Sequence, residues 1–339
     1  MNQNWFSIQP IWIFAAVLLL TLLSGLIGLP ILRRLGVGQT VRDDGPKTHY
    51  VKSGTPTFGG FFFLVPIALV TIVFQMANGF SSPEMALLLI LLTFGFAGFL
   101  DDYIKVRISK KGLSVRQKTV LLLAFSSGFT LWYLLALPVE PFLLVPGLGA
   151  LPILGWWKIP YGIFVVIYLF FIANSVNLTD GVDGLASSVT VMTGLALAAA
   201  GLVVQRLDLD TTLTRPAVAL SLMLAAGCLG FLAFNHHPAK VFMGDTGSQA
   251  LGAGVAAIAL FYGAPWILLF IGFIYVAESL SVVIQVAYFK RTGGKRIFRM
   301  SPIHHHFELG GWKENKVVLA FSAVTLVGSA LGLSLLALA

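Results

Sequence analysis

Residues 11–32 read IWIFAAVLLLTLLSGLIGLPIL and contain no charged side chain. As an α-helix, an apolar run of about 20 residues is long enough to cross a hydrocarbon core of roughly 30 Å. Similar runs recur along the chain. We therefore predict about ten membrane-spanning helices, at approximately 11–32, 58–78, 85–104, 119–137, 159–176, 185–204, 217–234, 247–262, 264–289 and 316–338.

The composition supports the same fold class. Of the 339 residues, 57% are hydrophobic and 11% are charged, whereas soluble domains carry about 25% charged residues. A β-barrel would need short alternating strands, and these runs are continuously apolar. Cys228 is the only cysteine, which excludes an intramolecular disulfide framework. We predict an all-α polytopic membrane protein with one domain, residues 1–339.

The ninth run, 264–289, is too long for a simple span. As a helix it would extend roughly 39 Å at 1.5 Å per residue. It must therefore tilt, break or project from the membrane. Glu278 lies near its middle, and a carboxylate at that depth disfavours a plain lipid-facing helix. Glu278 either belongs to a bent helix that frames a groove or pairs with polar groups inside the bundle.

Charge is distributed unequally between the two sides of the predicted membrane. Nineteen of the 22 basic residues fall in loops on one side, and the exceptions are Lys158, Arg206 and Arg215. Because basic loops remain in the cytoplasm, we expect that side to be cytoplasmic and both termini to be outside. Nine of the 14 acidic residues share the basic side. Five of them lie at or near the ends of apolar runs, namely Asp101, Asp102, Asp180, Asp183 and Asp245.

Carboxylates so close to hydrocarbon need a partner. Mg²⁺, which prefers oxygen ligands and shared phosphates, would supply one. Asp101 and Asp102 diverge by about 100° on a helix, so we do not expect them to act as one bidentate ligand. One would bind metal or substrate, and the other would meet Lys105 or a backbone amide. The alternative is an interfacial pair satisfied by neighbouring basic residues.

Two further loops carry aspartates between glycines. In 174–186, Asp183 is either a ligand or an N-cap of the following helix, whereas Asp180 has no such structural explanation. In 235–248, Gly244 and Gly247 flank Asp245, an arrangement that suits a metal-bound carboxylate or a phosphate cradle at a helix start. Phe242 in the same loop is either a membrane-interface anchor or a ring that stacks on a planar base.

Basic and hydroxyl side chains complete the predicted site. Lys52 and Thr57, in a Gly/Pro/Thr-rich loop, suit phosphate oxygens, although such loops are also ordinary linkers. The run His304-His305-His306 follows a stretch with five basic residues, 290–299. Zinc ligands are normally separated by two or more residues, although a metal cluster is an alternative. Because so many cations surround these histidines, we expect them to donate hydrogen bonds to anionic oxygens. The pattern indicates Mg²⁺-assisted phosphate chemistry. An ion-coupled transporter is an alternative class, but it would place its carboxylates near the bilayer midplane. Here most of them lie at the ends of apolar runs on one face, which disfavours that class.

These segments resemble those of the phospho-N-acetylmuramoyl-pentapeptide transferase family, a branch of the polyprenyl-phosphate N-acetylhexosamine-1-phosphate transferase superfamily. The resemblance covers nearly the whole chain, and the last motif separates this branch from relatives that use UDP-GlcNAc. The matching motifs are VRDDGP at 41–46, GTPTFGG at 54–60, FLDDY at 99–103, NLTDGVDGL at 177–185, VFMGDTGS at 241–248 and IFRMSPIHHHFEL at 297–309.

The resemblance implies an enzyme of peptidoglycan biosynthesis, and hence of cell-wall growth, cell shape and division, in the bacterial inner membrane. Undecaprenyl phosphate would attack the β-phosphate of UDP-MurNAc-pentapeptide, giving lipid I and UMP, with Mg²⁺ as cofactor. Membrane lipids would surround the protein, a homodimer is one candidate assembly, and no nucleic acid is expected. A transferase that uses UDP-GlcNAc is the nearest alternative.

The resemblance also implies roles for individual residues. Asp101, Asp102, Asp245 and His304 would be catalytic, with Asp245 and Asp101 at the metal. Asp101 would act either as a nucleophile or as a base; we favour a direct attack in which Asp101 and Asp102 organise the metal and the acceptor. From Glu278 and the length of the ninth run, we expect a bent helix that frames a groove for the isoprenoid chain. The substrate-binding residues would be Lys52, Thr57, Lys105, Asn177, Asp180, Gly181, Val182, Asp183, Asn235, Phe242, Gln285, His304 and His305, with Gly181–Asp183 and Phe242 forming the uridine pocket.

Overall fold

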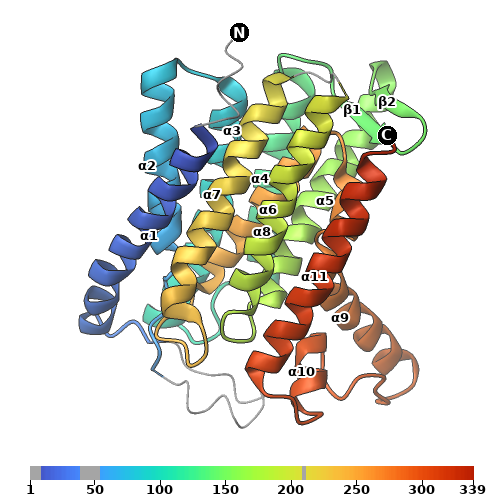
Figure 1. Cartoon of the computed structure of the whole chain (residues 1–339). Coiled ribbons are helices and arrows are strands. Elements are labelled where there is room, and N and C mark those ends of the chain that lie inside the picture. Colours follow the sequence, from blue (N-terminus) through green and yellow to red (C-terminus); the bar gives the residue numbers. More distant parts are fainter. Residues whose placement is uncertain (1–8, 39–53, 208–210) are drawn as a thin grey trace.

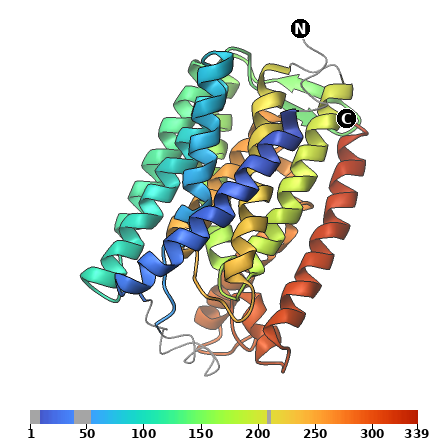
Figure 2. The same cartoon turned by 60° about the vertical axis from the view of Figure 1, so that its left-hand side comes forward.

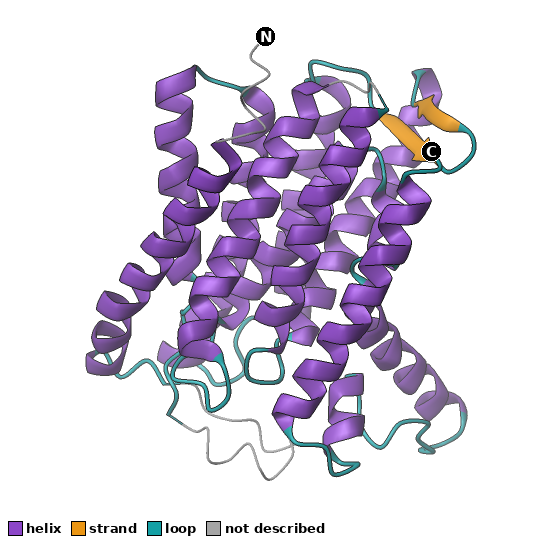
Figure 3. Cartoon of the chain, viewed as in Figure 1, coloured by secondary structure: helices purple, strands orange, loops and turns teal. Residues whose placement is uncertain are grey.

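The computed structural model describes residues 9–38, 54–207 and 211–339. They form a bundle of long helices with one small hairpin (Figures 1 and 3). In chain order the elements are α1 (Gln9–Arg34), α2 (Phe61–Asn78), α3 (Ser82–Arg107), α4 (Val115–Leu135), β1 (Phe142–Val145), β2 (Gly149–Pro152), η3 (Gly155–Trp157), α5 (Lys158–Thr179), α6 (Leu185–Arg206), α7 (Thr211–Asn235), α8 (Gly244–Phe261), η4 (Pro265–Leu269), α9 (Phe273–Arg291), α10 (Ile303–Glu308) and α11 (Glu314–Leu336).

Within these described ranges, nine helices are long and apolar enough to cross a membrane. The predicted all-α polytopic class is therefore confirmed. The predicted span that is not among these nine is the eighth, 247–262, which corresponds to α8 and begins with the polar sequence GDTGSQ. Nearly every residue of α8 is buried, and the helix packs against α3, α5 and α7. A helix enclosed by other helices needs small side chains for close approach, and Gly and Ala supply them here.

The ninth predicted run is broken, as its length indicated. η4 is followed by a turn at 270–272, after which α9 begins. Figure 1 shows α9 leaving the bundle at an angle to its neighbours. Its outward side chains are apolar and exposed, including Val283, Ile284 and Val286. Glu278, in contrast, is completely buried. A straight ninth helix packed on all sides is thus excluded.

The two ends of the bundle differ in what they carry. α1 begins, and α11 ends, at the end that also holds the antiparallel hairpin β1–β2 (Figures 1 and 2). Trp266 Nε1 donates to the carbonyl of Leu144 at 2.7 Å and ties this hairpin to η4. At the opposite end α3 and α5 finish, α8 starts and α10 lies (Figure 1). The polar motifs of the sequence meet at that opposite end.

Candidate functional site

Asp245, in the first turn of α8, is the centre of the polar cluster. Its Oδ1 accepts a hydrogen bond from Asn177 Nδ2 at 3.0 Å. Its Oδ2 lies 3.1 Å from Lys105 Nζ and 2.5 Å from Lys118 Nζ. The first turn of a helix favours a negative charge, because its free N–H groups and the helix dipole are directed toward it. The predicted residues Asp245, Lys105 and Asn177 therefore come together.

Asp101 shares the same two lysines. Its Oδ2 lies 2.6 Å from Lys105 Nζ and 3.7 Å from Lys118 Nζ, and its Oδ1 accepts from the backbone N–H of Leu113 at 2.7 Å. The Asp101 side chain is 4% exposed and that of Asp245 is 15% exposed. Two ammonium groups thus bridge two carboxylates, and Asp245 is the more accessible of the pair.

Lys118 did not figure among the predicted site residues. It lies in the first turns of α4, just after the capping box that Ser114 and Gln117 form. The sequence signal was a basic residue at the start of an apolar run. Such lysines are common wherever a helix enters the cytoplasm, so this signal alone did not distinguish Lys118 from its neighbours.

Asp102 has a different environment from Asp101. It is 1% exposed. It accepts from the N–H of Asp245 at 3.1 Å, and from the N–H and Oγ1 of Thr246 at 2.9 and 2.7 Å. It therefore caps the N-terminus of α8 from another helix. As expected, the two aspartates do not form one bidentate unit, and the partner of Asp102 is backbone amide.

Gly244 makes this contact possible. Its φ is +69°, which favours glycine. A Cβ at this position would overlap both Asp102 Oδ2 and Thr57 Oγ1. Thr57 itself is buried, and its Oγ1 has no hydrogen-bond partner among the described residues. Lys52, predicted to act beside Thr57, lies outside the described ranges.

Asp180 is the C-cap residue of α5 and lies at the edge of the cluster, where it is partly exposed. Desolvation, with the negative charges of Asp245, Asp102 and Asp183, raises its pKa well above the usual range. Asp180, Asp245 and Asp101 present hard oxygen donors, and their combined negative charge exceeds that of Lys105 and Lys118. This donor set suits Mg²⁺, which binds through carboxylates and substrate phosphates.

Asp183 lines a second part of the site. Its Oδ2 accepts from the N–H of Ala239 at 3.0 Å and lies 3.1 Å from His237 Nδ1. His237 Nδ1 is also 3.6 Å from Glu314 Oε2. The N-cap of α6 is Gly184 and has no side-chain cap bond, so Asp183 does not cap that helix. A pocket of about 680 Å³ lies here, lined also by Thr55, Trp312 and Lys313.

The remaining residues of the predicted uridine pocket lie around this turn. Gly181 is exposed, Val182 is buried and Phe242 is partly buried. The backbone of Phe242 exchanges hydrogen bonds with Pro56 and Gly59, which holds the 235–248 loop against the start of α2. The turn and the loop are therefore neighbours of the carboxylate cluster, although Val182 faces the core.

Two predicted substrate residues have their polar atoms committed to protein. Asn235 Oδ1 accepts from Gly184 N and Ser187 Oγ, and its Nδ2 donates to the carbonyl of Val241. Gln285 Oε1 accepts from Ile297 N and Phe298 N, and its Nε2 donates to the carbonyl of Phe298. In this structure both side chains brace the loops that form the site.

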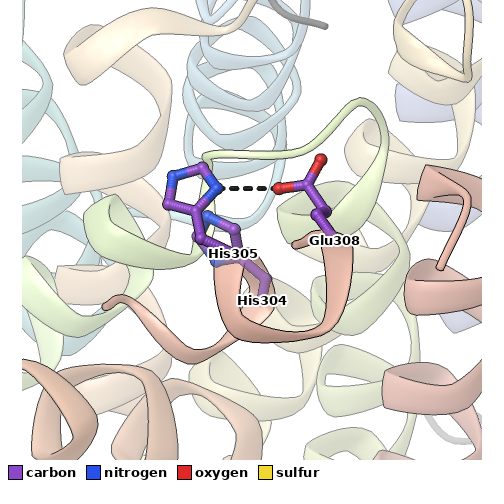
Figure 4. Close-up of side chains that lie close together, drawn as sticks. All are labelled: His304, His305 and Glu308. Atoms are coloured by element: carbon purple, nitrogen blue, oxygen red, sulfur yellow. Dashed lines mark hydrogen bonds and ion pairs between the residues drawn. The ribbon is translucent and has the colours of Figure 1, made fainter. Parts of the chain in front are cut away.

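The three histidines of α10 point to three separate partners. His305 Nδ1 lies 2.7 Å from Glu308 Oε2, with His304 beside it (Figure 4). His304 Nδ1 lies 3.0 Å from Glu278 Oε1. His306 Nδ1 accepts from the N–H of Arg299 at 3.1 Å, and its ring packs on Phe298. His306 thus has a local structural role.

Two groups of three side chains in the described ranges have ligand atoms within 4.8 Å of one another. They are His304–His305–Glu308 and Asp183–His237–Glu314. Neither contains Asp245 or Asp101, whose nearest cations are lysines. In the first group each imidazole already meets its own carboxylate. Glu308, Glu314 and His237 were not among the predicted site residues. The i,i+3 spacing of His305 and Glu308 could have signalled their pair, whereas no spacing in the sequence joins Asp183, His237 and Glu314.

Comparison with known proteins identifies the family of the chain. The family model for glycosyl transferase family 4 matches residues 84–263. A phospho-N-acetylmuramoyl-pentapeptide-transferase of Pelotomaculum thermopropionicum is 46% identical, over 96% of this chain and 97% of its own. Proteins of the same name from Acetivibrio thermocellus and Listeria innocua are 44% and 43% identical, over 96% and 93% of this chain and 96% and 94% of their own. The chain is a multi-pass membrane transferase of peptidoglycan synthesis and belongs to the phospho-N-acetylmuramoyl-pentapeptide-transferase family.

Proposed function

We propose that this enzyme transfers phospho-MurNAc-pentapeptide from UDP-MurNAc-pentapeptide to undecaprenyl phosphate, with Mg²⁺ as cofactor, and releases lipid I and UMP. The observation that carries the proposal is the cluster of Asp245, Asp101, Lys105 and Lys118 at one end of a membrane bundle. One substrate is water-soluble and the other is held in lipid. A site at the membrane surface gives both of them access.

The end that bears this cluster faces the cytoplasm, and the hairpin end faces outward. The proposal rests on the charge distribution, because the basic loops join helices at the cluster end. Lys158 and Arg206 lie where α5 starts and α6 finishes, at the opposite end. In a bacterium the membrane would be the inner membrane, where a cytoplasmic nucleotide-sugar meets an isoprenoid phosphate.

The reaction balances as a direct displacement. An oxygen of the lipid phosphate forms a bond to the β-phosphorus of the donor, and the bond from that phosphorus to the bridging oxygen of UMP breaks. A phosphate monoester has a second pKa near 6, so the attacking oxygen needs little deprotonation at neutral pH. Phosphoryl transfer then depends on positioning and charge neutralisation.

The residues of the cluster would divide these tasks. Asp245, with Asp101 and Asp180, would hold Mg²⁺, which when bound neutralises diphosphate charge and orients the leaving group. Lys105 and Lys118, released from Asp245 Oδ2 as the metal binds, would contact phosphate oxygens. Asp102 would keep the start of α8 in place. Asp101 Oδ1 accepts from Leu113 N, which favours an organising role over nucleophilic attack.

The substrates would approach from two directions. The nucleotide and sugar would lie over the turn at Asp180 and Asp183, near His304 and His305. The isoprenoid chain would lie along α9, whose exposed apolar side chains include Val283 and Ile284. Because α9 diverges from the bundle (Figure 1), an isoprenoid chain could lie along its apolar face without crossing the protein core.

The test is a donor competition with purified protein in detergent. Undecaprenyl phosphate and Mg²⁺ are supplied with either UDP-MurNAc-pentapeptide or UDP-GlcNAc, and UMP is measured. We expect UMP from the muramoyl donor alone, loss of activity with EDTA and with Asp245→Ala, and normal activity in Glu140→Gln, which alters an exposed pair with Lys158. UMP from UDP-GlcNAc alone would move the protein to the sister branch.

A trapping experiment separates the two mechanisms. The enzyme is mixed with the donor alone, quenched, and examined by intact-protein mass spectrometry. Direct displacement predicts no covalent adduct. A phospho-MurNAc-pentapeptide adduct on Asp101 that is chased into lipid I by undecaprenyl phosphate would overturn the single-step proposal.

A further inference from the structure

Glu278 and His304 form a buried pair next to the site. Glu278 lies in α9 with a side chain that is 0% exposed, and His304 is 1% exposed. The two carboxylate oxygens contact the same residue. Oε1 lies 3.0 Å from His304 Nδ1, and Oε2 accepts from the backbone N–H of His304 at 3.4 Å. One side chain thus holds both the ring and the backbone of His304.

This contact determines which ring nitrogen carries the proton. A carboxylate is only an acceptor, so Nδ1 must be the protonated nitrogen. In the neutral ring Nε2 then has a free lone pair and is an acceptor. Carboxylate partners commonly fix the tautomer and orientation of functional histidines in this way.

His304 Nε2 is the nitrogen left for a ligand. It is buried and has no hydrogen-bond partner among the described residues. It lies against Gly181, where a Cβ would overlap it. Asp180, the neighbour of Gly181, belongs to the carboxylate cluster, so Nε2 is directed toward the place where the sugar and its substituents would lie. A buried polar atom without a partner is unfavourable, and a hydrogen bond from a substrate group would remove that cost.

The neighbouring histidine is arranged differently. His305 Nδ1 meets Glu308 within the same short helix, and both side chains retain some exposure. This i,i+3 pair lies within one element, α10. The Glu278–His304 pair instead joins α9 to α10 and exists only in the assembled bundle.

We propose that Glu278 is a positioning residue that holds His304 in the Nδ1–H tautomer, so that Nε2 accepts a hydrogen bond from a hydroxyl or amide N–H of the sugar-peptide substrate. The inference rests on the proposed function and refines it. The composition of the loops predicted that the histidines of α10 donate hydrogen bonds to anionic oxygens. For His304 the geometry assigns the opposite role, in which Nε2 accepts a hydrogen bond from a substrate group.

The tautomer is measured directly by ¹⁵N NMR of protein labelled at histidine, with the His304 signals assigned from their loss in His304→Gln. We expect the proton on Nδ1 in the wild type. In Glu278→Gln the amide can donate to Nδ1, which moves the proton to Nε2. That variant should keep its unfolding midpoint and lose about 10- to 100-fold in kcat/KM, the usual cost of removing such a partner. Glu278→Asp, which keeps the acceptor, should restore the tautomer and part of the activity.

The matched control is Glu140→Gln, the same change at an exposed pair at the other end of the molecule; it should change neither signal nor rate. A proton on Nε2 of neutral His304 in the wild type would overturn the proposal without any variant. Full activity in a folded Glu278→Gln with the shifted tautomer would also overturn it. Absence of UMP formation by the wild type would instead contradict the proposed function. The NMR experiment would still show which tautomer His304 adopts beside Glu278.

Discussion

Asp102, near the end of α3, accepts hydrogen bonds from both the backbone N–H and the Oγ1 of Thr246 in the first turn of α8. A third bond comes from the N–H of Asp245. The residue that orients α8 is therefore adjacent in sequence to Asp101, which faces the lysines. One Asp-Asp pair thus serves two separate purposes.

Asp102→Asn should lower stability and activity together. The amide can accept at only one atom, and its NH₂ would face either the N–H of Asp245 or the N–H and hydroxyl of Thr246. Leaving such groups poorly paired costs about 1–3 kcal/mol. Thermal unfolding in detergent should therefore occur at a lower temperature. In contrast, Asp245→Asn should abolish UMP release with little loss of stability. Equal unfolding midpoints for Asp102→Asn and wild type would contradict the capping role.

Lys118→Ala should reduce the rate of UMP release by about 10²- to 10³-fold, the range seen when one preorganised stabilising group is removed. The reason is that Lys118 Nζ contacts Asp245 Oδ2 and lies near Asp101. The matched control is Lys111→Ala. Lys111 is an exposed lysine in the loop just before α4, and its replacement should leave activity normal. Steady-state measurements of UMP release by both variants test this prediction. Similar effects at the two positions would indicate a general charge effect in place of a specific contact.

Removal of metal should abolish activity reversibly. EDTA should stop UMP release, and Mg²⁺ should restore it in the wild type. In Asp180→Asn more Mg²⁺ should be needed, because one of the proposed oxygen ligands loses its charge. A titration of activity against Mg²⁺ gives the comparison. Unchanged Mg²⁺ dependence in Asp180→Asn would remove Asp180 from the metal site.

Asp180 should also make the metal-free protein sensitive to pH. Its pKa in the folded state is raised by burial and by neighbouring carboxylates, so the folded state binds the proton more tightly than the unfolded chain does. Stability from this residue is present at low pH and is lost as pH rises above the ordinary aspartate pKa of about 3.9 toward the raised value. Asp180→Asn should therefore lose less stability than wild type over this rise, as measured by unfolding midpoints without Mg²⁺.

Gly181→Ala should reduce activity without unfolding the protein. The new Cβ would overlap His304 Nε2, so the ring must move away from its substrate-facing position. Gly128→Ala is the matched control, since a Cβ there meets nothing within 4 Å, and alanine is the better helix former by about 1 kcal/mol. UMP release by the two variants is measured in parallel, and only Gly181→Ala should be slower than the wild type. Normal activity in Gly181→Ala would argue against a role for His304 at that turn.

The helices themselves were predictable because each apolar run must satisfy its backbone hydrogen bonds internally in a membrane. Residues 11–32 and 316–338 became α1 and α11 within a few residues. Even the break in 264–289 followed from its length and from Glu278. The run 247–262 was predicted as a span in the same way, and it became α8, which begins three residues earlier with polar side chains.

The partners of the polar side chains were not predictable in the same way. The sequence by itself determined that aspartates and lysines gather at one end of the bundle, because hydropathy and loop charge are local properties. Only the tertiary structure decided that Asp102 caps α8, that Lys118 reaches Asp245 and that Glu278 holds His304. Each of these contacts joins different helices. It depends on the rotation and depth of helices whose packing is set by side-chain shape along their whole length.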